Sequence, residues 1–219
     1  CYTDRTREAY FSFKKRNNIG HCLHESWSNI IMHLPYSFQG RRMLPEIYAL
    51  DANPALLDAT DVDYPAKLKE LAKTIEYREF VDQKLRPAEL ASSLIGNLYT
   101  GSIFMGLLST LCEHLRTGND ITGAEFGFLA YGSGSKSKVF QGEIQPEWRT
   151  SIAKVKLFET LATSVEIDFE TYERLHRKER HQSVRRAVSE WVLARIETQD
   201  PSLIGARYYQ WTDAQGNKL

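Results

Sequence analysis

A histidine with two arginines close behind it is the first feature that could do chemistry. His33 lies at the end of a short apolar run from Asn29 to Leu34, and Pro35 follows the run. Such a run predicts a buried strand, which would place the imidazole at the edge of a sheet. There it could donate to a substrate carbonyl or move a proton, while Arg41 and Arg42, on a predicted helix, could hold a distant anionic group. The alternative is a histidine bonded to the backbone and two solvated arginines.

Two further stretches carry polar or flexible groups. Asn97 lies in GNLYTGS at 96–102, which opens a predicted helix. The free backbone N–H groups at a helix N-terminus can bind an oxyanion. The Asn97 side chain adds a donor and an acceptor there, although it could simply cap the helix. Gly132 and Ser133 belong to AYGSGS at 130–135, where glycines let a ligand approach the backbone. The alternative for that stretch is a tight hairpin turn, and its spacing matches neither a nucleophile elbow nor a P-loop.

The three cysteines do not predict a metal or redox site. Cys1, Cys22 and Cys112 are not spaced as a CxxC pair or as metal-ligand pairs, which favours a reducing, cytoplasmic setting. Cys22 lies beside His21 and His24, but no fourth ligand follows at a suitable spacing. We therefore expect no bound metal.

Composition narrows the class of protein. The 219 residues are 42% hydrophobic and 26% charged, which is typical of a globular domain. Lys plus Arg and Asp plus Glu each number 28, so the net charge lacks the positive excess of a nucleic-acid binder. No run of apolar residues is long enough to span a membrane.

Hydrophobic periodicity predicts alternating helices and strands, and hence a layered α/β architecture with ligand sites at strand ends. The helix at 99–115 carries large apolar residues on one face and small residues on the other, so we expect it to be buried between layers. The stretch 51–64 reads as loop, and 187–197 is ambiguous. Helices are expected at 5–16, 36–50, 65–84, 88–94, 99–115, 147–163 and 168–182, with Asp168 as an N-cap, and strands at 29–34, 126–131, 137–144 and 205–212.

Taken in order, the motifs resemble the C-terminal half of hydroxymethylglutaryl-CoA synthase, a thiolase-fold family. The resemblance reaches to about residue 183 and implies one half of a layered α/β/α/β/α fold, with a mixed sheet and a buried central helix. It implies that residues 1–219 form the C-terminal half-domain and that the half with the catalytic cysteine lies outside this chain. The segments that carry it are HLPYSFQGRR at 33–42, GNLYTGS at 96–102, FLAYGSGS at 128–135, KVKLFETL at 154–161 and EIDFETYERLH at 166–176.

The same resemblance implies an acyltransferase of the mevalonate route to isoprenoids. It would condense acetyl-CoA with acetoacetyl-CoA and water to 3-hydroxy-3-methylglutaryl-CoA, with CoA thioesters as substrates and no cofactor. His33 would bind the acetoacetyl carbonyl, Asn97 and Ser133 would lie at the same substrate, and Tyr99 and Gly132 would border the pocket. The nucleophilic cysteine and the base glutamate would come from the N-terminal half, so we expect this chain alone to be inactive. A homodimer is also implied.

One departure from the family leaves other functions open. Phe38 stands where many relatives carry a lysine thought to contact CoA, so that role would fall to Arg41 and Arg42. One alternative is a synthase of polyketide β-branching that acts on a carrier-protein-bound acetoacetyl group. Another is a non-catalytic half-fold interaction module.

Overall fold

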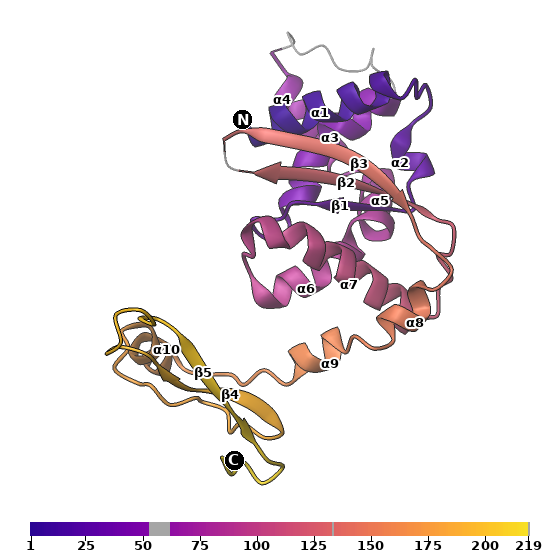
Figure 1. Cartoon of the computed structure of the whole chain (residues 1–219). Helices are drawn as coiled ribbons and strands as arrows, with labels where there is room; N and C mark the ends of the chain where they lie inside the picture. The colour runs from indigo at the N-terminus through magenta and orange to yellow at the C-terminus, as the bar shows by residue number, and fades with distance from the viewer. Residues whose placement is uncertain (53–61, 133, 219) are drawn as a thin grey trace. The chain divides into compact units, whose positions relative to one another are not determined.

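The computed structural model describes residues 1–52, 62–132 and 134–218 (Figure 1). The chain forms two compact units, unit 1 at residues 1–162 and unit 2 at residues 163–219. From the sequence we expected no division within residues 1–219. Among the described residues, no helix combines the length and apolar character needed to cross a bilayer.

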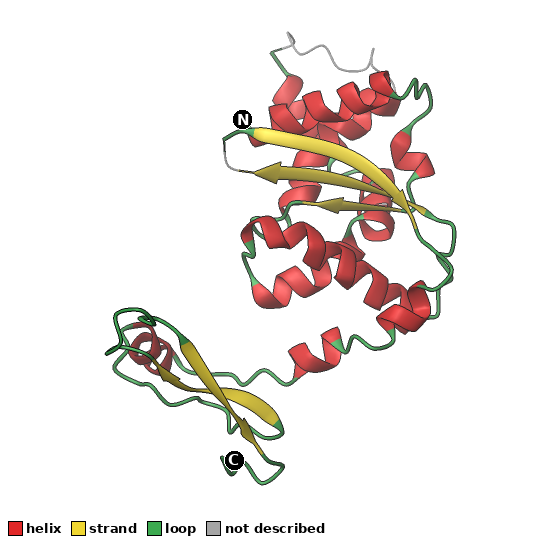
Figure 2. Cartoon of the chain, in the orientation of Figure 1, coloured by secondary structure: helices red, strands yellow, loops and turns green. Residues whose placement is uncertain are grey.

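A mixed three-stranded sheet forms the centre of unit 1 (Figure 2). Its order is β1 (Asn29–Met32), β2 (Glu125–Gly132) and β3 (Lys136–Glu143). β1 runs parallel to β2, with Ile31 opposite Phe128, and β2 pairs antiparallel with β3. All four residues of β1 are buried, as its continuous apolar run predicted. The expected strand and the expected mixed sheet are therefore both confirmed.

Helices cover both faces of this sheet, because successive side chains of β1 point to opposite sides. Ile30 and Met32 belong to one hydrophobic cluster, and Ile31 belongs to the other. The helices of unit 1 are α1 (Tyr2–Arg16), α2 (Leu23–Ser26), α3 (Gln39–Ala52), α4 (Tyr64–Leu71), α5 (Ile75–Lys84), α6 (Arg86–Ile95), the 3-10 turn η2 (Tyr99–Gly101), α7 (Ser102–Thr117), α8 (Trp148–Ile152) and α9 (Leu157–Ala162) (Figure 1). Helices α1, α2, α3 and α5 contribute to the first cluster, and α6, α7 and α8 to the second.

Two glycines allow the layers to approach closely. A Cβ atom on Gly127 of β2 would lie 2.0 Å from the indole of Trp27, which is fully buried. A Cβ atom on Gly106 of α7 would lie 3.2 Å from Ile31 in β1. Larger residues at either position would push a helix or an aromatic ring away from the sheet.

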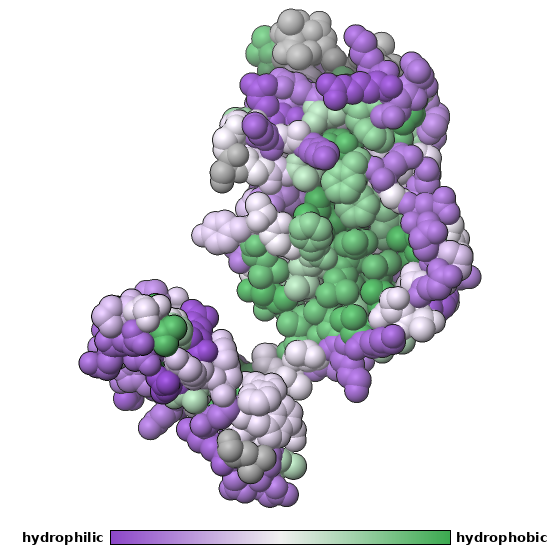
Figure 3. Space-filling model, viewed as in Figure 1, coloured by the Kyte–Doolittle hydropathy of each residue, from purple (hydrophilic) through white to green (hydrophobic). Residues whose placement is uncertain are grey.

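Helix α7 packs through its small residues. Ser102, Ser109 and Thr110 are fully buried, whereas Phe104 is 73% exposed. From the sequence we expected a helix covered on both faces, and in this chain the small-residue face is the covered one. Four leucines of the helix are partly buried against the second cluster: Leu107, Leu108, Leu111 and Leu115. Unit 1 carries a broad hydrophobic surface (Figure 3).

Several boundaries differ from the sequence-based expectation. The helix expected at 65–84 is two helices, because Thr74 caps α5 by accepting from the Tyr77 N–H. The helix expected at 147–163 is likewise divided into α8 and α9. Helix α1 begins at Tyr2 rather than at residue 5, and the chain turns after it at Asn18, whose φ is 54°. Most of the loop expected at 51–64 lies outside the described residues.

Unit 2 consists of α10 (Phe169–His176) and a hairpin of β4 (Glu190–Ile196) and β5 (Arg207–Thr212). The Asp168 carboxylate accepts from the Thr171 N–H at 2.7 Å, which confirms the predicted N-cap. The helix ends at residue 176 rather than 182. The ambiguous stretch 187–197 supplies β4, whose Trp191 pairs with Trp211 of β5.

Candidate functional site

His33 lies directly after β1 and continues its pairing with β2. Its backbone N–H donates to the Leu129 carbonyl at 3.0 Å, and its own carbonyl accepts from the Tyr2 hydroxyl. The Tyr2 ring meets the imidazole edge-on at 5.9 Å between centroids, and the Tyr131 ring lies 6.2 Å away. The strand end, α1 and β2 together therefore set the position of this half-buried ring.

The imidazole also has a partner on α7 that the sequence did not single out. Ser102 Oγ lies 3.0 Å from His33 Nδ1 and accepts from the Leu34 N–H at 2.9 Å. Ser102 is the last residue of the GNLYTGS motif, so its place in that motif was the available signal. Burial lowers the pKa of His33, which favours the neutral imidazole at neutral pH.

His33 borders an apolar cavity of about 360 Å³. Phe128 and Phe140 form part of its wall, with their rings stacked at 4.7 Å. The lining residues with a polar side-chain group are His33, Thr100 and Tyr131. A cavity with apolar walls and few polar groups suits a small acyl group whose carbonyl meets the imidazole. The remaining lining residues are Ile103, Phe104, Leu107 and Ala130.

Asn97 and Tyr99 form a local turn before α7. The Asn97 side-chain oxygen accepts from the Tyr99 N–H at 2.7 Å, as in an Asx turn. This is close to the capping role that we had weighed as the alternative. Tyr99 has a φ of 50° and is 76% exposed. In the described part of the chain, neither residue lines the cavity beside His33.

Gly132 ends β2, where it pairs with Lys136 of β3. Strands β2 and β3 are therefore the two arms of a hairpin, which agrees with the alternative considered for this stretch. A Cβ atom on Gly132 would meet no atom within 4 Å, so no described neighbour requires a glycine there. Ser133, the predicted site residue of this turn, lies outside the described residues.

The two arginines of α3 have different surroundings. Arg41 Nε donates to the Glu89 carboxylate at 3.1 Å, and a second bond from its guanidinium completes a bidentate pair. Glu89 is buried, and the Arg41 guanidinium also lies 4.6 Å from the centroid of the Phe38 ring. The bonds to Glu89 raise the pKa of Arg41. Arg42 is instead exposed and lies 5.5 Å over the Tyr36 ring.

Both arginines line a second cavity of about 790 Å³ between α3, α4 and α5. Lys69 and Arg78 add positive charge to its wall, and Glu46 and Asp82 add negative charge. This cavity shares no lining residue with the one beside His33. The structure therefore separates the predicted carbonyl-binding group from the predicted anion-binding groups.

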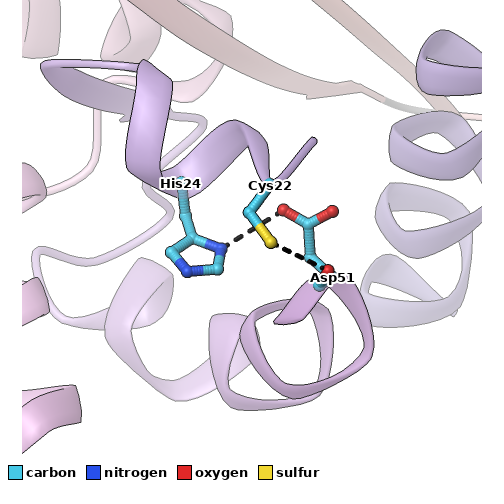
Figure 4. A group of neighbouring side chains, drawn as sticks. All are labelled: Cys22, His24 and Asp51. Carbon is cyan, nitrogen blue, oxygen red and sulfur yellow. Dashed lines mark hydrogen bonds and ion pairs between the residues drawn. The ribbon is translucent and has the colours of Figure 1, made fainter. Parts of the chain in front are cut away.

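Among the described residues, Cys22, His24 and Asp51 form a cluster whose potential ligand atoms all lie within 4.8 Å of one another, close enough to hold a metal ion (Figure 4). The Asp51 carboxylate accepts from His24 Nδ1 at 3.2 Å, from Tyr10 at 2.6 Å, from Lys14 and from a backbone N–H of α2. Burial would raise the pKa of Asp51, but these donors outweigh it and lower the pKa to about 2. The carboxylate is thus satisfied without an ion, and the lysine ammonium would repel a cation.

The thiol of this cluster is also poorly suited to metal binding. Cys22 Sγ lies 3.1 Å from the Asp51 carbonyl oxygen, and burial raises the pKa of the thiol. Metals bind the thiolate form, which this environment disfavours. His21, which the sequence placed beside Cys22, is not part of the cluster.

Comparison with known proteins shows where this geometry belongs. Residues 1–188 match the family model described as the C-terminal region of hydroxymethylglutaryl-coenzyme A synthase. The synthase of Haloferax volcanii is 33% identical over 115 residues, which cover 52% of this chain and 26% of that protein. The synthase of Enterococcus faecalis is 25% identical over 174 residues, which cover 78% of this chain and 38% of that protein. The chain therefore matches well under half the length of either relative.

Solved structures agree on the fold. MvaS in complex with 3-hydroxy-3-methylglutaryl coenzyme A superposes with a TM-score of 0.74 at 22% identity, covering 96% of this chain and 49% of that one. The HMG synthase of the curacin biosynthetic pathway superposes with a TM-score of 0.66 at 20% identity, covering 96% and 50%. The architecture is that of a thiolase-like half, with a mixed sheet between helical layers. Together with the match over residues 1–188, this places the chain in the hydroxymethylglutaryl-CoA synthase family, as a representative of its C-terminal region.

Proposed function

We propose that this chain supplies the acetoacetyl-binding part of an enzyme that condenses acetyl-CoA with acetoacetyl-CoA to 3-hydroxy-3-methylglutaryl-CoA. The observation that carries the proposal is the His33 imidazole, held by Ser102 beside an apolar cavity. In the condensation, the methyl group of the enzyme-bound acetyl thioester loses a proton to a base, and its carbon attacks the keto carbon of the acetoacetyl group. The carbonyl electron pair moves to the keto oxygen, where a donor fixed in advance lowers the barrier. Water later hydrolyses the thioester to the enzyme and releases the product.

The CoA portion would be held by Arg42 rather than Arg41. Arg41 is committed to the buried Glu89, whereas Arg42 is exposed and borders a cavity that Lys69 and Arg78 also line. Guanidinium groups suit phosphates because they form paired charge-assisted hydrogen bonds. A protein of the same fold, MvaS, has been solved with a CoA thioester bound, which supports a CoA substrate here.

The nucleophilic cysteine and the base glutamate would come from the N-terminal half of the same enzyme. The broad apolar surface of unit 1 supports this part of the proposal, because a surface of that kind is normally covered by a partner (Figure 3). Cys112 is buried on α7 and its pKa is raised by burial, so it does not serve as the nucleophile. The complete enzyme would be a homodimer.

An assay of thioester consumption tests this function. The 219-residue chain should not convert acetyl-CoA and acetoacetyl-CoA by itself, whereas the same residues joined to the N-terminal half should. Without a nucleophile, the reaction cannot pass through an acyl-enzyme. Turnover by the isolated chain at the rate of an ordinary enzyme would overturn the proposal that the nucleophile and the base come from the N-terminal half.

A carrier-protein substrate is the second candidate function. The HMG synthase of the curacin pathway has the same fold and has been solved in complex with a donor-ACP. Phe38 and the internal pairing of Arg41 leave fewer cations for CoA phosphates, which favours this alternative. Comparing kcat/KM for acetoacetyl-CoA and for acetoacetyl-ACP distinguishes the two, and a large preference for the ACP thioester would replace the CoA proposal.

A further inference from the structure

The hydrogen bonds around Ser102 determine which nitrogen of His33 carries the proton. The Leu34 N–H can only donate, so the hydroxyl oxygen of Ser102 accepts that bond, at 2.9 Å. The hydroxyl hydrogen then needs an acceptor of its own, because Ser102 is fully buried. His33 Nδ1 lies 3.0 Å from the same oxygen, and no other described residue offers Ser102 an acceptor.

The opposite arrangement is less favourable. If Nδ1 carried a proton, it would donate to an oxygen that already accepts from Leu34. The Ser102 hydroxyl hydrogen would then be buried without a partner, and such a group is costly in a protein interior. The favoured arrangement has the hydroxyl donating to Nδ1, so that a neutral ring carries its proton on Nε2.

We propose that Ser102 is a positioning residue that fixes His33 as the Nε2–H tautomer, so that the ring presents a neutral N–H donor to the substrate's keto oxygen. The proposal rests on the function proposed above, since it specifies how that site recognises the acetoacetyl group. Nδ1 is occupied by Ser102, which leaves Nε2 as the ring nitrogen for the adjoining cavity.

The tautomer matters because the ring is neutral. Burial lowers the pKa of His33, so the imidazolium form is disfavoured at neutral pH. In a neutral ring, one nitrogen donates and the other accepts. An Nε2 lone pair would repel a keto oxygen, whereas an Nε2–H stabilises the negative charge that grows there as the new carbon–carbon bond forms.

The helix provides a matched control for this role. Ser109 is also fully buried on α7 and also bridges two groups. It accepts from the Ala91 N–H at 3.2 Å and donates to the Pro87 carbonyl at 2.6 Å. Ser109→Ala therefore removes the same chemistry from the same helix without touching His33.

Nitrogen-15 NMR of histidine-labelled protein tests the proposal without any substrate. In the wild-type chain at neutral pH, His33 should show a proton on Nε2 and a hydrogen-bonded, proton-free Nδ1, with the signals assigned from a His33→Gln spectrum. Because histidine in water already favours the Nε2–H tautomer, the sensitive signal is the Nδ1 resonance. It should move in Ser102→Ala, with a minor Nδ1–H form appearing, and stay in place in Ser109→Ala and in the hydroxyl-retaining Ser102→Thr.

The results separate this inference from the proposed function. A wild-type ring protonated on Nδ1, or an Nδ1 resonance unchanged by Ser102→Ala, would overturn the role of Ser102 whatever the substrate is. A spectrum as expected in a protein that does not bind acetoacetyl-CoA would overturn the proposed function and leave the tautomer assignment intact. Melting curves of both alanine variants establish that the spectra come from folded protein.

Discussion

Two histidine-containing clusters in unit 1 differ in what surrounds the ring. His24 contacts the Asp51 carboxylate, whose oxygens also accept from side chains on α1 and from the backbone of α2. His33 has one side-chain partner, Ser102, and lines an apolar cavity. Each ring has one nitrogen with no bond to a described residue, so an open ring nitrogen alone does not mark a site. A carboxylate saturated with donors holds helices together, whereas a ring donor beside a cavity can hold a ligand.

The largest effect should come from removing the Asp51 carboxylate. Asp51→Ala leaves the Lys14 ammonium and the Tyr10 hydroxyl without their acceptor, and breaking such a buried pair costs about 3–5 kcal/mol of unfolding free energy. Urea unfolding measures the loss, and Asp51→Asn, which keeps an acceptor oxygen, should lose less. Zinc should not raise the melting temperature of the wild type. A zinc-dependent rise would make the cluster a metal site and break the comparison.

The pH dependence of stability should follow the same carboxylate. The folded-state pKa of Asp51, about 2, lies below the value of roughly 3.9 in an unfolded chain. The ionised group therefore stabilises the fold above about pH 4, by roughly 2–3 kcal/mol, and this contribution is lost as the pH falls toward 2. The stability difference between wild type and Asp51→Asn should shrink between pH 6 and pH 3. A difference that is constant across that range would contradict the assignment.

The two arginines of α3 show a similar contrast. Arg41 is paired with the buried Glu89, whereas Arg42 is exposed and can bind a ligand. In the complete enzyme, Arg42→Ala should weaken the binding of CoA substrates by about 1.5–3 kcal/mol, which raises their KM. The substitution should spare kcat, because it removes a contact remote from the reacting carbon. Arg41→Ala should instead lower the melting temperature, since it leaves the buried Glu89 without its cation. Steady-state kinetics and melting curves of both variants sharpen the comparison. A raised KM for Arg41→Ala with unchanged stability would reverse the two roles.

Local signals predicted much of the fold. Three features were predicted correctly because each depends on residues close together in the sequence. They are the buried strand β1, the Asp168 cap and the pairing of β2 with β3. The break between α4 and α5 was not predicted, because Thr74 sits in a stretch with continuous helical spacing. Apolar periodicity alone does not reveal a cap within a helical pattern.

The candidate site was less readable because its contacts are distant in sequence. His33 could be proposed from its place after a strand, but its partner Ser102 is 69 residues away. Arg41 and Arg42 were indistinguishable until the fold brought Glu89, 48 residues on, against Arg41. Similarly, the sequence placed Cys22 beside His21 and His24, whereas the fold keeps His24 in the cluster and adds Asp51. Pairings of this kind arise from tertiary packing and have no local pattern.

We assign His33 to the condensation step, and one comparison of rates tests this assignment. In the complete enzyme, His33→Ala should slow condensation about 10²–10³-fold, the usual cost of losing a preorganised donor to a developing oxyanion. Formation of the acetyl-enzyme should be nearly unchanged, because the nucleophile and its own donors would lie in the other half. Rapid-quench measurement of acetyl loading beside overall turnover, with a melting curve of each protein, separates the two steps. If loading and condensation fall together while the melting temperature drops, His33 is a packing residue and the proposed site is wrong.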